Sequence, residues 1–194
     1  MSFELAAFQE GYYPSVFVGK EATSLNKGET LKDTFENILA MSPDIMVVRS
    51  GDDLPMLELA ARSPVPVLNA GWGQASHPSQ ALLDMFTLSQ KFKDFSEIRL
   101  LVVGDVKHSR VFRSLSSLAD LLSIKVAIAC PHELSLSGFK SFPSLREGLE
   151  WANVGYFLRT QKERHQTNSQ SGFDLSSFSY SEPEHSFFLK KKGW

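Results

Sequence analysis

The sequence predicts an α/β fold of two parallel-sheet α/β subdomains that are joined by a bridging helix. Short apolar segments alternate with stretches of helical periodicity, which is the pattern of strand–helix–strand units with parallel strands. Several of these segments (IMVV, LLVV, VAIA) are apolar at consecutive positions, as expected for strands covered by helices on both sides. The 194 residues are 42% hydrophobic, which is enough for a sizeable core.

The individual elements follow from the same pattern. Six apolar segments are predicted to be strands, at residues 13–18, 45–48, 65–68, 100–103, 126–129 and 154–158. Five segments have apolar residues three or four positions apart and are predicted to be helices, at residues 30–40, 54–62, 78–92, 111–122 and 144–151. The opening residues SFELAAFQEG have the pattern of a further helix.

The helix predicted at residues 78–92 is expected to bridge the two domains. Pro78 suits its first turn, and Leu82, Met85, Phe86 and Ser89 are predicted to share its apolar face. The charged segment KFKDFSEIR then breaks the pattern, which places the boundary near residue 95. We therefore expect domains at 1–95, including the bridging helix, and 96–194. Both are expected to be incomplete, because the chain starts within a helical pattern and stops where a strand should begin.

Composition and charge exclude several classes of function. The formal net charge is -2, from 20 basic and 22 acidic residues, so we expect no nucleic-acid or membrane partner. A single cysteine, Cys130, excludes a disulfide framework and a Cys-rich zinc site. The opening residues lack a signal-peptide pattern, and no apolar run approaches the roughly 18 residues of a membrane span. A cytoplasmic location is expected.

Polar side chains gather after the predicted strands, where open α/β sheets bind ligands. In chain order these candidates are Ser24, Lys27, Arg49, His77, Gln80, Arg110, Arg159 and Gln161. Recurring cations and amides favour an anionic substrate that carries phosphate and carboxylate groups. Plainer interpretations remain open at this point: Lys27 and Arg49 as surface cations, and His77 as a helix cap.

Other chemistries lack their motifs. The sequence contains no GxxxxGK[ST] loop, no GxGxxG after a strand, and no GxSxG, which argues against nucleotide binding and serine hydrolysis. It has no HExxH or clustered His and Cys residues, so no metal is expected. Cys130 follows a predicted strand, but no base partner identifies it as a nucleophile.

Four segments together resemble the aspartate carbamoyltransferase family. HPSQALLDMFTL at 77–88, preceded by NAGWG, resembles the family's signature, and SLNKGETLKDT resembles its mobile loop. VVGDVKHSRVFRS resembles the first strand–turn–helix of its aspartate domain, and FLRTQKER the segment that binds the aspartate side chain. The motifs cover residues 3–165 in the family's order. The LLD triplet and the RTQKER segment favour this family over ornithine carbamoyltransferases.

The resemblance implies the carbamoyltransferase fold and a reaction without a cofactor. In it, the α-amino group of L-aspartate attacks carbamoyl phosphate, giving N-carbamoyl-L-aspartate and phosphate in pyrimidine biosynthesis. His77, Arg49 and Lys27 are implied to be catalytic. The residues implied to bind carbamoyl phosphate are Ser24, Lys27, Arg49, His77 and Gln80, and those for aspartate are Lys27, Arg110, Arg159 and Gln161. The loop with Ser24 and Lys27 implies a homotrimer with shared active sites, and regulatory or dihydroorotase subunits are further partners that the family allows.

The sequence departs from the family pattern in three places. The Ser-Thr-Arg-Thr phosphate loop that precedes the first helix in the family is not in this sequence, nor are its later His-Pro loop and final helix. Trp72 stands where the family usually has Asp after Asn-Ala-Gly. We therefore expect the 194-residue chain itself to be weakly active or inactive. The alternatives are a catalytically inactive carbamoyltransferase-like binding or assembly subunit, and an ornithine-type enzyme.

Overall fold

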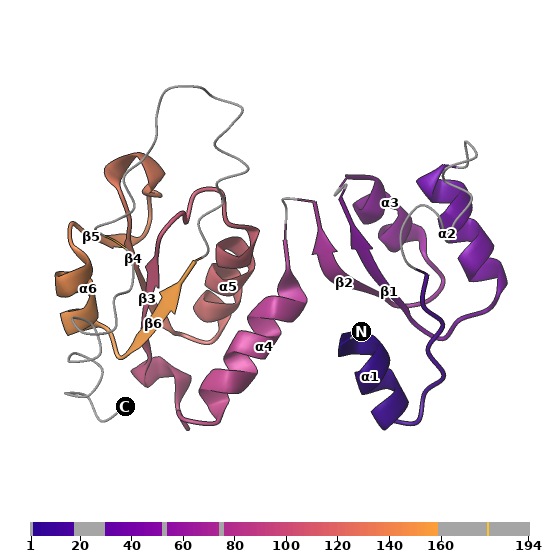
Figure 1. Ribbon diagram of the computed structural model, residues 1–194, viewed down its shortest axis with the longest axis horizontal. Coiled ribbons are helices and arrows are strands. Elements are labelled where there is room, and N and C mark those ends of the chain that lie inside the picture. The colour runs from indigo at the N-terminus through magenta and orange to yellow at the C-terminus, as the bar shows by residue number, and fades with distance from the viewer. Residues whose placement is uncertain (1, 18–29, 52–53, 74–75, 159–177, 179–194) are drawn as a thin grey trace. The chain divides into compact units, whose positions relative to one another are not determined.

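The computed structural model describes residues 2–17, 30–51, 54–73, 76–158 and 178, and the chain forms two compact units. The first unit spans Met1–Gly73 and the second Gln74–Trp194. Each unit is an α/β structure with a parallel sheet, as predicted (Figure 1). The division into compact units falls after Gly73 and does not test the domain boundary predicted near residue 95, which stays a prediction.

The first unit contains three helices and two strands in its described part. In chain order they are α1 (Ser2–Gln9), α2 (Leu31–Ala40), β1 (Met46–Ser50), α3 (Leu54–Arg62) and β2 (Val67–Trp72). The two strands pair in parallel, with Met46 opposite Val67. Helix α2 begins at a capping box, in which Thr30 Oγ1 accepts from the Asp33 amide and the Asp33 carboxylate accepts from the Thr30 amide.

The core of this unit lies between α2, α3 and one face of the strand pair. Phe35, Met46, Met56 and Trp72 are buried together there. On the strands, Val47 and Leu68 are 42% and 45% exposed. The alternation of buried and exposed residues along β1 is that of a strand covered on one face, rather than on the two faces that its apolar sequence predicted.

The prediction of a strand at residues 13–18 is wrong for residues 13–17, because the structure describes these residues and none of them belongs to a strand. Tyr13 is 99% exposed, and Val16 and Phe17 are about half exposed. A β-branched and aromatic segment becomes a strand only where a neighbouring strand accepts its backbone hydrogen bonds, and Pro14 has no N–H to donate to one. Residue 18 lies outside the described residues.

The second unit contains a four-stranded parallel sheet in the order β5-β4-β3-β6. Its strands are β3 (Arg99–Val103), β4 (Lys125–Ala129), β5 (Lys140–Phe142) and β6 (Val154–Phe157). Its helices are α4 (Pro78–Ser89), α5 (Arg110–Leu121) and α6 (Leu145–Trp151), with short 3-10 turns at Phe95–Glu97 and His132–Leu134. The short strand β5 was missed by the sequence pattern.

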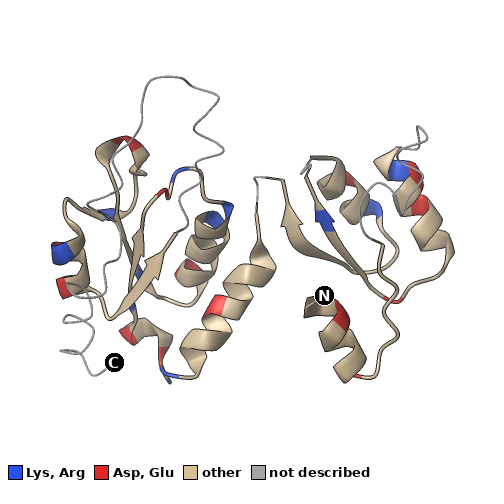
Figure 2. Ribbon diagram, in the orientation of Figure 1, with Lys and Arg blue, Asp and Glu red and all other residues tan. Residues whose placement is uncertain are grey.

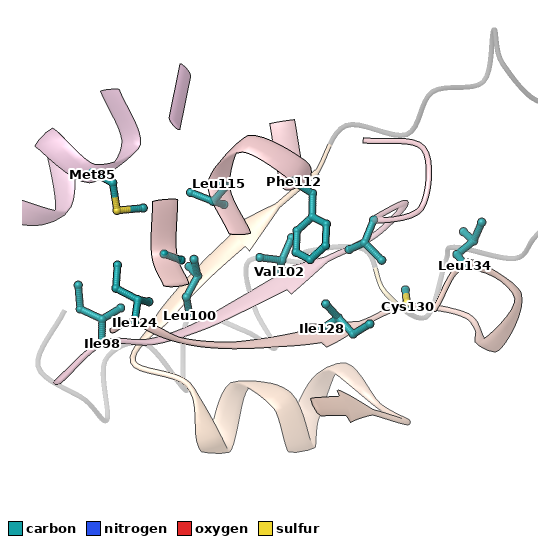
Figure 3. Close-up of a cluster of buried hydrophobic side chains, with 12 residues drawn as sticks. Met85, Ile98, Leu100, Val102, Phe112, Leu115, Ile124, Ile128, Cys130 and Leu134 are labelled. Carbon is teal, nitrogen blue, oxygen red and sulfur yellow. The ribbon is translucent and has the colours of Figure 1, made fainter. Parts of the chain in front are cut away.

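Two apolar layers enclose this sheet. On one side, α5 and Met85 of α4 pack against β3 and β4, and Phe112 and Leu115 point toward Val102 and Leu100 (Figure 3). On the other side, Leu145 and Leu149 of α6 pack against Leu101, Val103 and Ala127. Strand β3 is therefore buried on both faces, as its sequence predicted.

Helix α4 buries Met85 of its predicted apolar face, but not Leu82 or Phe86. Its buried residues are Ala81 and Met85, whereas Leu82, Leu83 and Phe86 are each at least 59% exposed. Several apolar stripes fit its sequence, and only packing against α5 selects one of them. The helix ends at Ser89, three residues before the predicted end.

Neither unit gathers charge of one sign in its described elements. Acidic and basic residues are mixed over the elements of each unit (Figure 2). Within the described part of the chain, no helix is both long enough and apolar enough to span a bilayer.

Candidate functional site

Arg49 lies on β1 of the first unit, next to a break in the parallel ladder. Its side chain is exposed, and its neighbours Val48 and Ser50 pair with Asn69 and Trp72 on β2. Trp72, which the sequence left unexplained, is buried and donates its indole N–H to the carbonyl of Val48 over 2.9 Å. Arg49 is thus placed at the carboxyl end of a strand, as predicted.

His77 immediately precedes α4 in the second unit, and its backbone ties that helix start to α5. Its amide donates to Ser114 Oγ over 2.8 Å. Its ring Nδ1 lies 3.2 Å from Ser79 Oγ. His77 is the N-cap residue of α4, as the plainer interpretation expected, but its ring makes no capping hydrogen bond to the helix backbone.

Arg110 is the first residue of α5, in the turn after β3. Ser109 is the N-cap residue of this helix, and its Oγ accepts from the Phe112 amide over 3.1 Å. Ser114 follows Arg110 by four residues, which places both on one face of α5. Because Ser114 holds the His77 amide, Arg110 and His77 lie at the same side of this helix.

Gln80 is oriented by Asp84, which Tyr156 contacts in turn. Its Nε2 donates to Asp84 Oδ1 over 3.0 Å, one helical turn along α4. Burial raises the pKa of Asp84, while hydrogen bonds from Gln80 and from Tyr156 of β6 act in the opposite direction. Burial, followed by the charge of Asp84, also raises the pKa of Tyr156. The spacing of four residues between Gln80 and Asp84 could have indicated their contact, but no sequence feature indicated Tyr156.

The turn after β3 holds a further pair that sequence analysis missed. Asp105 is buried and accepts from the His108 amide and from His108 Nδ1, at 3.2 and 2.9 Å from its Oδ1. Cys130 is buried near this carboxylate, and desolvation followed by the charge of Asp105 raises the pKa of its thiol to about 11. Such a thiol stays protonated at neutral pH, which argues against the nucleophile interpretation.

In the second unit, a hydrogen bond therefore joins the start of α4, which carries His77 and Gln80, to α5, which begins with Arg110, and Arg49 lies in the first unit. Ser24, Lys27, Arg159 and Gln161 lie outside the described residues. Among the residues that the structure does describe, no three His, Cys, Asp or Glu side chains are grouped so that they could hold a metal ion. Imidazole, amide and guanidinium groups at strand and helix ends can bind anions and stabilise developing negative charge.

A family model and curated proteins match this chain. The model described as "Aspartate/ornithine carbamoyltransferase, carbamoyl-P binding domain" matches residues 1–90. The aspartate carbamoyltransferase catalytic subunit of Helicobacter pylori (strain Shi470) is 38% identical over 168 residues, which cover 84% of this chain and 54% of that protein. The chain thus spans about half the length of this curated relative.

Solved structures also match this chain. An aspartate transcarbamoylase from Trypanosoma cruzi, in complex with N-(phosphonacetyl)-L-aspartic acid, gives a TM-score of 0.81 at 27% identity, over 98% of this chain and 65% of that one. The catalytic subunit of the M. jannaschii enzyme gives 0.73 at 30% identity, over 85% and 58%. These likenesses confirm the predicted carbamoyltransferase fold.

Proposed function

The chain belongs to the aspartate/ornithine carbamoyltransferase family, and from this we propose that it transfers the carbamoyl group of carbamoyl phosphate to the α-amino group of L-aspartate. The products are N-carbamoyl-L-aspartate and phosphate, at an early step of pyrimidine biosynthesis. One observation carries the proposal beyond likeness: the His77 amide is bound to Ser114 of α5, which sets the HPSQ segment beside Arg110. This contact supports the proposal because it joins the start of α4, where the proposed carbamoyl donor His77 lies, to α5, which begins with the proposed carboxylate ligand Arg110.

The reaction develops negative charge on the carbamoyl oxygen and on the departing phosphate. Fixed donors at those positions lower the barrier, because they are ordered before the reaction begins. Ser79 Oγ lies within hydrogen-bond reach of His77 Nδ1. When the Ser79 hydroxyl donates to Nδ1, the neutral ring carries its proton on Nε2, which becomes the donor to the carbamoyl oxygen. Arg49 of the first unit is also proposed to be catalytic, as a cation that stabilises developing negative charge.

The remaining described residues orient the two substrates. Gln80 accepts from and aligns the carbamoyl amide through its side-chain oxygen, because its Nε2 is already committed to Asp84. Arg110 binds the aspartate α-carboxylate through its guanidinium fork. Holding the amine near the carbamoyl carbon in this way supplies the proximity that a bimolecular reaction lacks.

The wider assembly is part of the same proposal. Ser24 and Lys27 complete the phosphate side from an adjacent subunit of a homotrimer, and Arg159 and Gln161 bind the aspartate side chain. We place the protein in the cytoplasm, where regulatory or dihydroorotase subunits are its candidate partners. Sedimentation of the purified chain tests the trimer.

Calorimetry with N-(phosphonacetyl)-L-aspartate tests the function, together with an assay for N-carbamoyl-aspartate. We expect the chain to bind this analogue, and His77→Ala to reduce whatever turnover it has by on the order of a hundredfold to a thousandfold, as for loss of one preorganised donor. The melting temperature should change little, since the ring makes no capping hydrogen bond.

His132→Ala is the matched control, because His132 lies in the short turn after β4. It should leave binding and turnover unchanged. Binding of the analogue without turnover would favour the inactive binding subunit, and no binding at all would contradict the proposal. If His77→Ala instead lowered mainly the melting temperature, its role would be structural.

A further inference from the structure

The parallel ladder between β1 and β2 is interrupted beside Arg49. Val48 pairs with Asn69, and the next paired residues are Ser50 and Trp72, so two steps along β1 match three along β2. Strand β2 therefore carries an extra residue, which is the definition of a β-bulge. Gly71 lies in this bulge with a φ of 111°, a conformation that favours glycine, and its amide donates to Asn69 Oδ1 over 2.7 Å.

Trp72 lies next to this bulge and is buried in the core of the first unit. Its side chain is 5% exposed and packs with Phe35, Met46 and Met56. Its indole Nε1 donates to the Val48 carbonyl, and the amide of the following Gly73 donates to the Ser50 carbonyl over 2.9 Å. The residues on both sides of Arg49 are thus held by the 72–73 segment.

We propose that Trp72 is a positioning residue, whose indole N–H fixes the backbone at the bulge and thereby aims Arg49. The role for Arg49 rests on the proposed function, but the link between Trp72 and the Arg49 backbone does not. Bulges re-aim side chains next to active sites, and a bulge needs its own fixing because it interrupts the ladder. A buried indole supplies this through one directional hydrogen bond and a large packed surface.

Trp72→Phe separates these two contributions, because phenylalanine keeps an apolar ring but has no N–H. We expect carbamoyl phosphate to bind about twofold to tenfold more weakly in calorimetry, which is the worth of one hydrogen bond. In an Arg49→Ala background the same substitution should have no further effect, since the residue through which it acts is gone. Trp151→Phe in the second unit, whose ring packs on Phe142, is the matched control and should bind as the original chain does.

Hydrogen exchange provides a readout that needs no ligand. In Trp72→Phe, exchange at the amides of residues 48–50 should accelerate at least severalfold, while amides of β3 and β4 keep their rates. Trp151→Phe should leave residues 48–50 unchanged. Unchanged exchange at 48–50 in Trp72→Phe would overturn the proposal. So would an equal loss of binding from Trp72→Phe in the original chain and in the Arg49→Ala background. If the original chain failed to bind carbamoyl phosphate, the proposed function would fail, and exchange alone would decide the role of Trp72.

Discussion

The two compact units bury their parallel sheets to different depths. In the second unit, β3 is enclosed between the layers of α5 and α6, and four of its five residues are buried. In the first unit, the pair β1–β2 is covered by α2 and α3 on one face, and Val47 and Leu68 are nearly half exposed on the other. Apolar segments of similar composition thus form a strand covered on both faces in the second unit and a strand pair covered on one face in the first.

This difference also governs how polar groups are held. The second unit keeps Asp105 and Ser109 buried in the turn after β3, where neighbouring donors satisfy both. In the first unit, Arg49 is exposed, and the buried Trp72 donates a hydrogen bond to the backbone beside it. A sheet packed on two sides can therefore position site residues through buried polar contacts, whereas a sheet packed on one side relies on a buried aromatic side chain.

Truncating one phenylalanine in each core should give the largest contrast between the units. Phe112 is 1% exposed and lies 5.0 Å from the ring of Phe139. Phe112→Ala should lower the free energy of unfolding of the second unit by about 3–5 kcal/mol. Phe35→Ala should cost the first unit less, because side chains packed against its core, such as Leu31 and Ile38, are only partly buried and can relax into the cavity. Urea unfolding followed by residue-resolved NMR measures each unit separately, which matters because two units need not unfold as one.

Phe86→Ala on α4 is the control for these substitutions, since its side chain is 66% exposed. It should change the free energy of unfolding by no more than about 0.5 kcal/mol. Equal losses for Phe35→Ala and Phe112→Ala would contradict the comparison, because they would mean that the one-sided core is as tightly packed as the two-sided core.

The helix caps give a smaller contrast of the same kind. Ser109→Ala removes the acceptor of the buried Phe112 amide, and an unsatisfied buried donor costs about 1–3 kcal/mol. Thr30→Ala removes an exposed cap from α2, where water replaces the lost acceptor, and should cost about 1 kcal/mol or less. The same urea experiment measures both, with Ser117→Ala on the exposed part of α5 as control. A larger loss at Thr30 would show that burial does not set the value of a cap here.

The sequence predicted the elements whose signal is local. Strands β1, β3, β4 and β6 came from apolar runs, and their parallel pairing followed from the helices between them. β5 was missed because KSF is too short and polar to give a pattern. Residues 13–17 were wrongly expected to form a strand, because composition cannot tell whether a neighbouring strand exists.

The site shows the same limit. Arg49, His77, Gln80 and Arg110 could be proposed as site residues from the sequence because they lie at strand ends and helix starts, which are local features. The residues that hold them were not found, because each contact spans a long stretch of chain: Trp72 to Val48, Ser114 to His77, and Tyr156 to Asp84. Only the folded chain brings such pairs together.

Two aspartates, one in each unit, should show the smallest but most direct contrast, because their pKa values move in opposite directions. Hydrogen bonds from Thr30 lower the pKa of Asp33 from its ordinary value of 3.8, and burial raises the pKa of Asp84 from the same value. A carboxyl-detected NMR titration should therefore place Asp33 below 3.8 and Asp84 above it.

Stability follows from these directions with opposite signs. The folded chain binds the Asp84 proton more tightly than the unfolded chain, so the contribution of Asp84 to stability falls as pH rises from 3.8 through its raised pKa. The contribution of Asp33 is present above 3.8 and is lost as pH falls through its lowered pKa. The free energy of unfolding of Asp84→Asn, relative to that of the original chain, should therefore be higher at pH 7 than at low pH. The corresponding value for Asp33→Asn should be lower at pH 7 than at low pH. Shifts of both carboxyls to the same side of 3.8 would refute the contrast, because both groups would then sit in equivalent surroundings.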